Sequence, residues 1–177
     1  MESAKRLLIE GRPGSGKTTV AARVAELLQA RGAAAAGFLT REIRERGRRI
    51  GFEVEALDGE REVLAHIDLP GPPRVGKYGV DLEAFERVAL PAISEPDAQV
   101  VVIDELGKME LASSRFCDAV RGLLEQSLPL LATVHAHRHP FTDDVKRRAD
   151  VELIRLTRSS RDQLPERLAS RLDLGSP

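Results

Sequence analysis

The chain is poor in several residue types, and each shortage excludes a class of protein. It has 177 residues, no tryptophan, no asparagine, 3% aromatic residues and one cysteine. A single cysteine, Cys117, cannot form an internal disulfide, which excludes a disulfide-stabilised scaffold. No apolar run approaches the roughly 20 residues that a membrane-spanning helix needs. We find no signal peptide ahead of Lys5, and we therefore expect a soluble cytoplasmic protein with no membrane partner.

An excess of charge of either sign is also missing. Lysine and arginine number 27, aspartate and glutamate number 28, and the formal net charge is -1. Bulk charge therefore indicates no nucleic-acid partner, and any affinity for phosphate must be local. The 42% of hydrophobic residues can form a substantial core, and the length predicts a single domain over residues 1–177. We expect this domain to be a monomer.

Strands and helices are predicted to alternate along most of the chain. Consecutive apolar residues, as in 100–103, are typical of strands buried on both faces of a parallel sheet. Apolar residues at helical spacing follow such strands, as in 20–28. Within residues 36–67 the pattern changes to alternation, with Phe52 and Val54 separated by a glutamate, which predicts an antiparallel insertion. The fold class is therefore α/β, a three-layer sandwich with a mostly parallel sheet and an antiparallel insertion after the first helix.

Polar residues and prolines predict where the later helices begin and end. Asp81 can cap the second helix, and Pro91 should kink or end it. Ser113 or Ser114 caps the next one. A further helix is predicted over 143–148, and its three basic final residues are interpreted as a solvated helix end.

The first apolar strand leads into a glycine-rich segment of defined spacing. Residues 11–18 fit G-x-x-x-x-G-K-[ST], the P-loop motif, between a predicted strand and a predicted helix. In such a loop, backbone N–H groups and the helix dipole face a polyphosphate, Lys17 neutralises its β and γ oxygens, and the Thr18 hydroxyl is available to Mg²⁺. The predicted phosphate-binding residues are Gly11, Arg12, Pro13, Gly14, Ser15, Gly16, Lys17, Thr18 and Thr19.

Two acidic residues follow the buried apolar strand at 100–103. Asp104 stands where a Walker B carboxylate is expected and can hold Mg²⁺ together with Thr18. Glu105 is placed to polarise a water molecule in line with the γ-phosphate. The alternative interpretation is that Glu105 is an exposed acid at a helix start.

Polar residues also end the strand that follows. Thr133 or His135 can contact the γ-phosphate or orient the attacking water. Histidines occupy every second position from His135 to His139, at 135, 137 and 139. No carboxylate or cysteine accompanies them at short spacing, so we predict no metal site there. Cys117 has no base nearby in sequence and is interpreted as a small buried side chain.

Beyond the P-loop, five sequence blocks occur in the order found in one family. They are residues 37–42, 50–52, 64–66, 75–80 and 104–110. In these blocks, and nearly continuously from Lys5 to about Asp162, the chain resembles the cancer-related, thermophile-type nucleoside-triphosphatases. The resemblance implies a slow Mg²⁺-dependent hydrolase of ATP, GTP, CTP and UTP, with a fold related to the RecA-like branch of P-loop proteins. At residues 160–162 the family's Asn-Arg-Asp is replaced by Ser-Arg-Asp, which puts a role for the first residue in doubt.

A second cation is expected near the nucleotide, because charge that develops on the γ-phosphoryl oxygens is usually met by an arginine or lysine. Lys108 is the first choice, since it lies four residues beyond Asp104 and just past a glycine. Arg161 is the second.

Three functions are compatible with these motifs. Hydrolysis of nucleoside triphosphates is favoured because Glu105 beside Asp104 suits water as the acceptor. A nucleotide or small-molecule kinase is the alternative, with residues 36–80 forming the acceptor pocket. A non-enzymatic nucleotide switch is the third, although the guanine-reading motif [NT]-K-x-D is absent.

Overall fold

The strands form one continuous sheet. The computed structural model describes residues 5–94 and 96–173, so the segment ahead of Lys5, where we expect no signal peptide, lies outside the described residues. The strands are β1 Arg6–Gly11, β2 Ala35–Glu45, β3 Arg48–Ala56, β4 Arg61–His66, β5 Arg74–Val75, β6 Tyr78–Val80, β7 Val100–Leu106, β8 Leu130–His135 and β9 Val151–Arg155. They are hydrogen-bonded in the order β5-β6-β4-β3-β2-β7-β8-β1-β9.

The sheet is parallel at one end and antiparallel at the other. β2, β7, β8, β1 and β9 pair in parallel. The remaining pairings, which join β2, β3, β4, β6 and β5, are antiparallel. β2 belongs to both parts, so the predicted antiparallel insertion begins within the parallel sheet. Because Gly11 lies opposite His135, the carboxyl ends of β1 and β8 meet at one edge, and β7 ends beside them.

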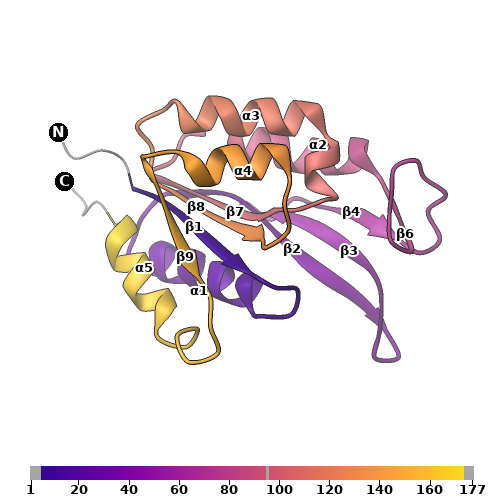
Figure 1. Ribbon diagram of the computed structural model, residues 1–177, viewed down its shortest axis with the longest axis horizontal. Coiled ribbons are helices and arrows are strands. Elements are labelled where there is room, and N and C mark those ends of the chain that lie inside the picture. The colour runs from indigo at the N-terminus through magenta and orange to yellow at the C-terminus, as the bar shows by residue number, and fades with distance from the viewer. Residues whose placement is uncertain (1–4, 95, 174–177) are drawn as a thin grey trace.

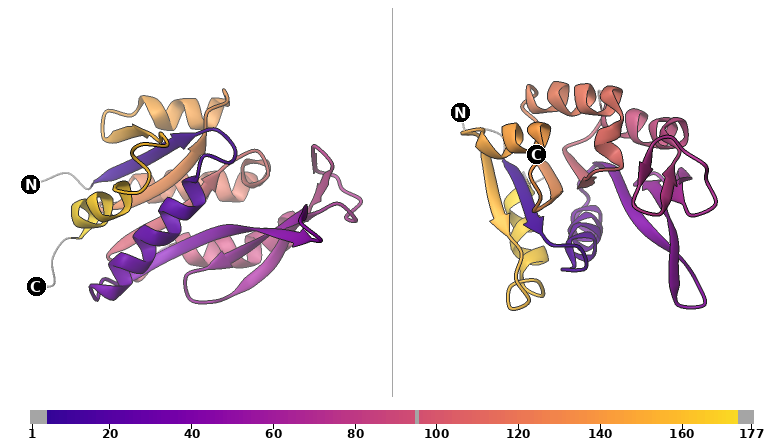
Figure 2. Two further views of the ribbon diagram at one scale, coloured as in Figure 1. Left: turned by 90° about the horizontal axis from the view of Figure 1, so that it is seen from below. Right: turned by 45° about the vertical axis from the view of Figure 1, so that its right-hand side comes forward.

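Helices cover both faces of the sheet, which confirms the three-layer prediction (Figure 1). Helices α1 (Lys17–Ala30) and α5 (Leu164–Leu172) lie together on one face, as Figure 2 shows from below. Helices α2 (Leu82–Ile93), α3 (Ser114–Leu124) and α4 (Pro140–Arg147) cover the other face. Two separate apolar cores result, one on each side of the sheet. Helices on both faces explain why Val100–Ile103 are apolar at consecutive positions.

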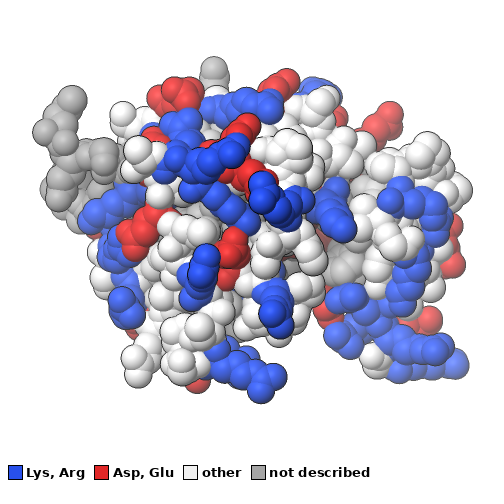
Figure 3. All heavy atoms as spheres, in the orientation of Figure 1, with Lys and Arg blue, Asp and Glu red and all other residues white. Residues whose placement is uncertain are grey.

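The antiparallel strands extend the sheet away from the parallel half (Figure 2). The end of the β2–β3 hairpin is rich in arginine, with exposed Arg44, Arg46, Arg48 and Arg49. Figure 3 shows this concentration of positive side chains at the lower right of the molecule. Elsewhere in the antiparallel part, Phe52 of β3 and Tyr78 of β6 pack edge to face, with ring centroids 5.2 Å apart.

Two predicted helix starts are confirmed and one is corrected. Asp81 accepts a hydrogen bond from the Ala84 N–H, and Ser113 accepts one from the Phe116 N–H. Helix α2 ends at Ile93, just after Pro91, since a proline in the last turn removes a single N–H group and leaves the earlier turns intact. Helix α4 begins at Pro140 rather than at residue 143, since proline suits the first helical position and His139 caps the N–H of Phe141.

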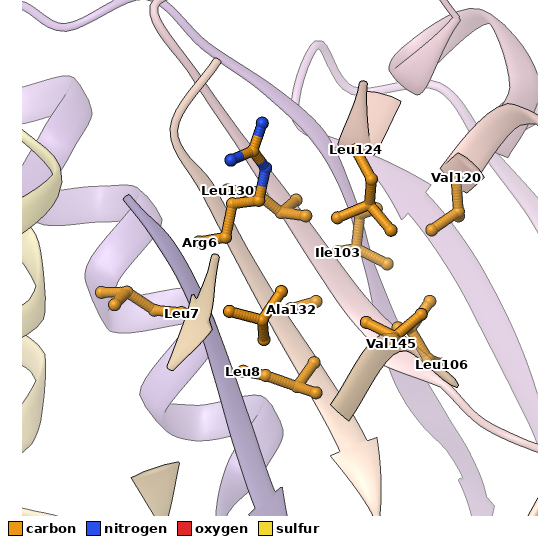
Figure 4. Close-up of a pocket in the computed structure, with 11 residues that line it drawn as sticks. Arg6, Leu7, Leu8, Ile103, Leu106, Val120, Leu124, Leu130, Ala132 and Val145 are labelled. Carbon is orange, nitrogen blue, oxygen red and sulfur yellow. The ribbon is translucent and has the colours of Figure 1, made fainter. Parts of the chain in front are cut away.

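The core beneath α3 and α4 is closely packed. Figure 4 shows side chains from β1, β7, β8 and these helices around a cavity of about 10 Å³. That volume is at the lower limit for one water molecule, so the cavity is a packing gap and no ligand site. Within the described residues, no helix is both long enough and apolar enough to cross a membrane.

Candidate active site

The glycine-rich loop joins the end of β1 to the start of α1, as predicted. Gly14 and Gly16 have φ angles of +76° and +99°, which residues with a side chain rarely adopt. A Cβ atom on Gly11 would lie 2.5 Å from the Ser15 Oγ, so a side chain here would have to displace the Ser15 hydroxyl. The loop borders a cleft of about 710 Å³ that also includes Thr18, Thr19 and Glu105.

Lys17 lies inside this loop and is only 7% exposed. Its Nζ donates a hydrogen bond to the Gly11 carbonyl oxygen at 2.7 Å. The same Nζ lies 3.6 Å from Glu105 Oε2, and this ion pair joins the P-loop to the end of β7. The structure thus brings together two residues, 88 positions apart in sequence, that we predicted to act on one phosphate.

Asp104 is completely buried among hydroxyl groups. Thr133 Oγ1 donates to Asp104 Oδ1 at 2.6 Å, and Thr40 Oγ1 donates to Asp104 Oδ2 at 3.3 Å. Burial raises the pKa of the Asp104 carboxyl, while hydrogen bonds from Thr133, Thr18 and Thr40 oppose that rise. The hydroxyl of Thr133, one of two candidates for contacting the γ-phosphate, is therefore engaged in holding Asp104.

Glu105 is partly accessible, with 30% of its side chain exposed. Burial raises the pKa of its carboxyl, and the charge of Lys17 opposes the rise. A Cβ atom on Gly107 would lie 2.8 Å from Glu105 Oε1 and 2.9 Å from Glu110 Oε2, so the two carboxylates approach each other across this glycine. Glu110, in the short 3₁₀ helix η1 (Glu110–Ala112), is buried, and burial and Glu105 raise its pKa well above the usual range. Sequence reasoning missed Glu110, since no spacing rule singles it out.

His135 ends β8 at the same edge and is 5% exposed. Neither of its ring nitrogens has a hydrogen-bond partner among the described residues. Burial, with a contribution from Lys146, lowers the pKa of His135 to about 4, so the ring is neutral at pH 7. A neutral ring offers one N–H donor and one acceptor nitrogen. Of the two candidates for contacting the γ-phosphate or the attacking water, Thr133 and His135, only His135 therefore has polar side-chain atoms without a partner among the described residues.

Lys146 contradicts our interpretation of its helix end as solvated. Its Nζ lies 2.6 Å from Glu10 Oε2 and donates to the His135 carbonyl oxygen at 3.1 Å. Only 14% of the Lys146 side chain is exposed. Tertiary packing turns the Lys146 side chain toward the end of β1, where Glu10 precedes the P-loop. The ion pair with Glu10, and not the dipole of α4, therefore determines where this charge lies.

The two candidate cations lie on different sides of the loop. Lys108 is exposed and borders a second cavity of about 220 Å³, which we call the side chamber. Glu105 and His135 also line the side chamber. Arg161 borders the opposite side of the P-loop, and its Cδ is 3.8 Å from where a Cβ on Gly16 would be. Sequence reasoning also missed Arg49, whose side chain lines the P-loop cleft.

The remaining candidates have structural roles. Cys117 is buried, and burial raises the pKa of its thiol, which is unsuited to a nucleophile. Ser160 Oγ accepts a hydrogen bond from the Thr157 N–H and stabilises a turn. The rings of His135 and His137 lie 5.7 Å apart, and the described part of the chain contains no group of three or more His, Cys, Asp or Glu residues that could hold a metal.

Comparison with known proteins agrees with this geometry. Residues 6–169 match a family model described as NTPase. The chain is 44% identical to nucleoside-triphosphatase THEP1 of Thermofilum pendens, with 94% of each chain covered. It superposes on the crystal structure of THEP1 from Aquifex aeolicus with a TM-score of 0.83 and 33% identity, covering 95% of this chain and 99% of that one.

The second solved structure is human. It is the solution structure of a cancer-related nucleoside triphosphatase, with a TM-score of 0.84, 36% identity, and coverage of 98% of this chain and 100% of that one. Both names agree with the resemblance that the five sequence blocks indicate. The match extends over both the parallel and the antiparallel strands, and the chain therefore belongs to the NTPase family of nucleoside-triphosphatases.

Proposed function

We propose that this protein hydrolyses nucleoside 5′-triphosphates to diphosphate and phosphate, with Mg²⁺ and with broad tolerance for the base. The observation that carries the proposal is the ion pair of Lys17 with Glu105, which places a phosphate-binding cation and a carboxylate base in one cleft. Family membership supports hydrolysis, and the relatives compared above are named as triphosphatases. The kinase alternative receives no support from them.

The residues beside the P-loop fit a magnesium ion. The Asp104 carboxylate and the Thr18 hydroxyl are oxygen donors within hydrogen-bonding reach of each other. Mg²⁺ prefers such oxygen ligands and usually takes only one or two from the protein, with water and phosphate oxygens as the others. When bound, Mg²⁺ would neutralise charge on the β- and γ-phosphate oxygens. We propose that Asp104 and Thr18 hold it, with Thr133 and Thr40 fixing the carboxylate.

The chain's own residues then act on water and on the phosphates. Glu105 accepts a proton from the attacking water, whose oxygen forms a bond to the γ-phosphorus. The bond from that phosphorus to the β-bridging oxygen breaks, and the diphosphate leaves with the electron pair. Lys17 offsets the negative charge that accumulates on the oxygen that bridged the β- and γ-phosphorus atoms. Burial raises the pKa of Glu105 toward the working pH, which makes the carboxylate a stronger base.

Turnover of ATP, GTP, CTP, UTP and TTP at fixed Mg²⁺ tests this function. We expect phosphate release from all five, with rates within about two orders of magnitude, because no motif reads a base edge. The assay contains no hydroxyl acceptor other than water, so release of phosphate also separates hydrolysis from a kinase. A profile restricted to one nucleotide contradicts the broad tolerance, and binding without turnover favours a switch.

Lys108 is proposed as the cation that stabilises the transition state. We expect Lys108→Ala to lower the single-turnover rate by about tenfold or more, with little loss of nucleotide affinity, because the charge acts as the γ-phosphoryl group leaves. Lys77→Ala, in the β5–β6 turn, serves as the control. An unchanged rate in Lys108→Ala would transfer the role to Arg161 or to another chain.

Removing the charge of Asp104 should lower the affinity of the active site for Mg²⁺. We expect Asp104→Asn to raise the Mg²⁺ concentration for half-maximal turnover by about tenfold or more, since a charged oxygen ligand is lost. The measurement is a Mg²⁺ titration of phosphate release at saturating ATP. Asp118→Asn, a change at an exposed position of α3, is the matched control. Superimposable titrations of the two variants would argue against Asp104 as a ligand.

A further inference from the structure

The side chamber is much larger than hydrolysis requires. It has a volume of about 220 Å³ and opens beside the Glu105 carboxylate. A water molecule occupies about 30 Å³ in the liquid, and an apolar cavity of about 150 Å³ holds benzene. The chamber therefore has room for a ring-sized organic molecule next to the attacking water.

One side of the chamber is apolar and comes from the antiparallel strands, while Thr40, Glu105, Lys108, Glu110, His135 and His137 supply polar or charged groups on the rest of its wall. Phe52 of β3, Leu64 of β4 and Val75 of β5 form one side, and Met109 lies beside Glu110. These strands lie outside the parallel half of the sheet, where Asp104 and Glu105 end β7 and Lys17 begins α1. An aromatic ring, a thioether and two aliphatic side chains make a surface suited to a flat apolar body.

The polar groups at the chamber are incompletely satisfied by the protein. His135 lines it, is 5% exposed, and has no hydrogen-bond partner on either ring nitrogen among the described residues. Burying such a group without a partner destabilises the protein. A ligand that both donates and accepts a hydrogen bond, as a hydroxyl does, would restore the missing partner.

Charge restricts the ligand further. Glu105 lies on the chamber wall and repels an anion, while the Lys108 charge is exposed to solvent. An uncharged ligand avoids the cost of desolvating an ion in an apolar pocket. The chamber therefore favours a neutral ring molecule with a hydroxyl group.

We propose that the side chamber is a binding site for a second, uncharged ligand, a ring compound with a hydroxyl group, which lies against Phe52 and Met109 with its hydroxyl at His135 and Glu105. The consequence for turnover rests on the proposed role of Glu105 in hydrolysis. A bound ligand occupies the space beside the Glu105 carboxylate and slows the attack of water.

Three small probes test the site. The chain has two methionines, so a sample labelled with ¹³C at the methionine methyl groups gives few signals, and Met109→Leu assigns the one from the chamber. We expect benzyl alcohol to shift the Met109 signal saturably, with a Kd on the order of 1 mM for so small a ligand. Toluene lacks the hydroxyl and benzoate carries a charge, so both should bind at least about tenfold more weakly.

A matched pair of variants localises the binding. Val75→Phe fills the chamber and should abolish the benzyl alcohol shift, whereas Val63→Phe, at an exposed position of β4, should retain it. Thermal unfolding checks that both variants fold. No shift at Met109, equal binding of toluene, or a shift that survives in Val75→Phe would overturn the proposal.

The effect on hydrolysis is measured separately. Saturating benzyl alcohol should slow phosphate release by the wild-type protein by about tenfold or more, because the probe lies beside the base. Unaltered phosphate release with the chamber occupied would overturn the predicted consequence. The methyl signal reports binding in the absence of nucleotide, so a failure of the proposed hydrolytic role of Glu105 would leave the binding result unaffected.

Discussion

Glu105→Gln should slow the chemical step of hydrolysis by about 10²- to 10⁴-fold, equivalent to about 3 to 5 kcal/mol of barrier. The amide keeps the shape of the carboxylate and much of its hydrogen bonding, but it cannot accept the proton of the attacking water. Nucleotide and Mg²⁺ affinity should change little, because Lys17, Thr18 and Asp104 remain. Single-turnover hydrolysis and a separate binding measurement distinguish the two effects.

The matched control for this variant is Glu83→Gln. Glu83 is an exposed acid in the first turn of α2, the kind of residue that Glu105 would be on the alternative interpretation. Neutralising such an acid costs about 0.3 to 1 kcal/mol of stability and leaves catalysis unchanged. A Glu105→Gln protein that binds normally and hydrolyses within about threefold of the wild-type rate would refute the role of general base.

Lys17→Ala is expected to weaken triphosphate binding strongly and to abolish measurable turnover. The loop keeps its N–H donors, but the positive charge that meets the β- and γ-phosphate oxygens is gone. The variant also removes the hydrogen bond to the Gly11 carbonyl and the ion pair with Glu105, so the loop loses two internal contacts. Equilibrium binding of ATP and steady-state phosphate release measure the two effects.

Lys5→Ala controls for the loss of a lysine. Lys5 precedes β1, whereas the P-loop follows it, so the strand separates the two positions. Similar thermal unfolding of the two variants, together with loss of turnover in Lys17→Ala alone, would assign the effect to phosphate binding. Normal turnover in Lys17→Ala would contradict the P-loop assignment.

Short-range features were predictable from the sequence. Each of these features depends on residues within a few positions of one another. They are helix α1, the glycine-rich loop that precedes it, and the helix caps at Asp81 and Ser113. The boundaries of α2 and α4 were less predictable, because a proline is tolerated in a last turn and favoured in a first one. Local propensity limits where a helix can end, and packing chooses among the permitted positions.

Long-range partners were not predictable. Thr40 and Glu110 lie in two of the five family blocks, but no spacing rule assigns them or Lys146 to the site. In the structure they contact or lie close to Asp104, Glu105 and His135. Their positions depend on β2 pairing with β7, on η1 bringing Glu110 close to Glu105 beside Gly107, and on Lys146 of α4 reaching Glu10 at the end of β1. Each contact requires the strand order, which no local pattern specifies.

The sequence by itself determined the geometry of the loop that we propose binds phosphate, because a strand, a glycine-rich loop and a helix start are contiguous, and their geometry follows from covalent connection and backbone preference. It also determined that two carboxylates follow a buried strand. Only the tertiary structure decided that Lys17 meets Glu105, that hydroxyls from two other strands hold Asp104, and that residues of the antiparallel strands line a chamber beside Glu105. The physical reason is that side chains distant in sequence become neighbours only when the order of strands in the sheet is set.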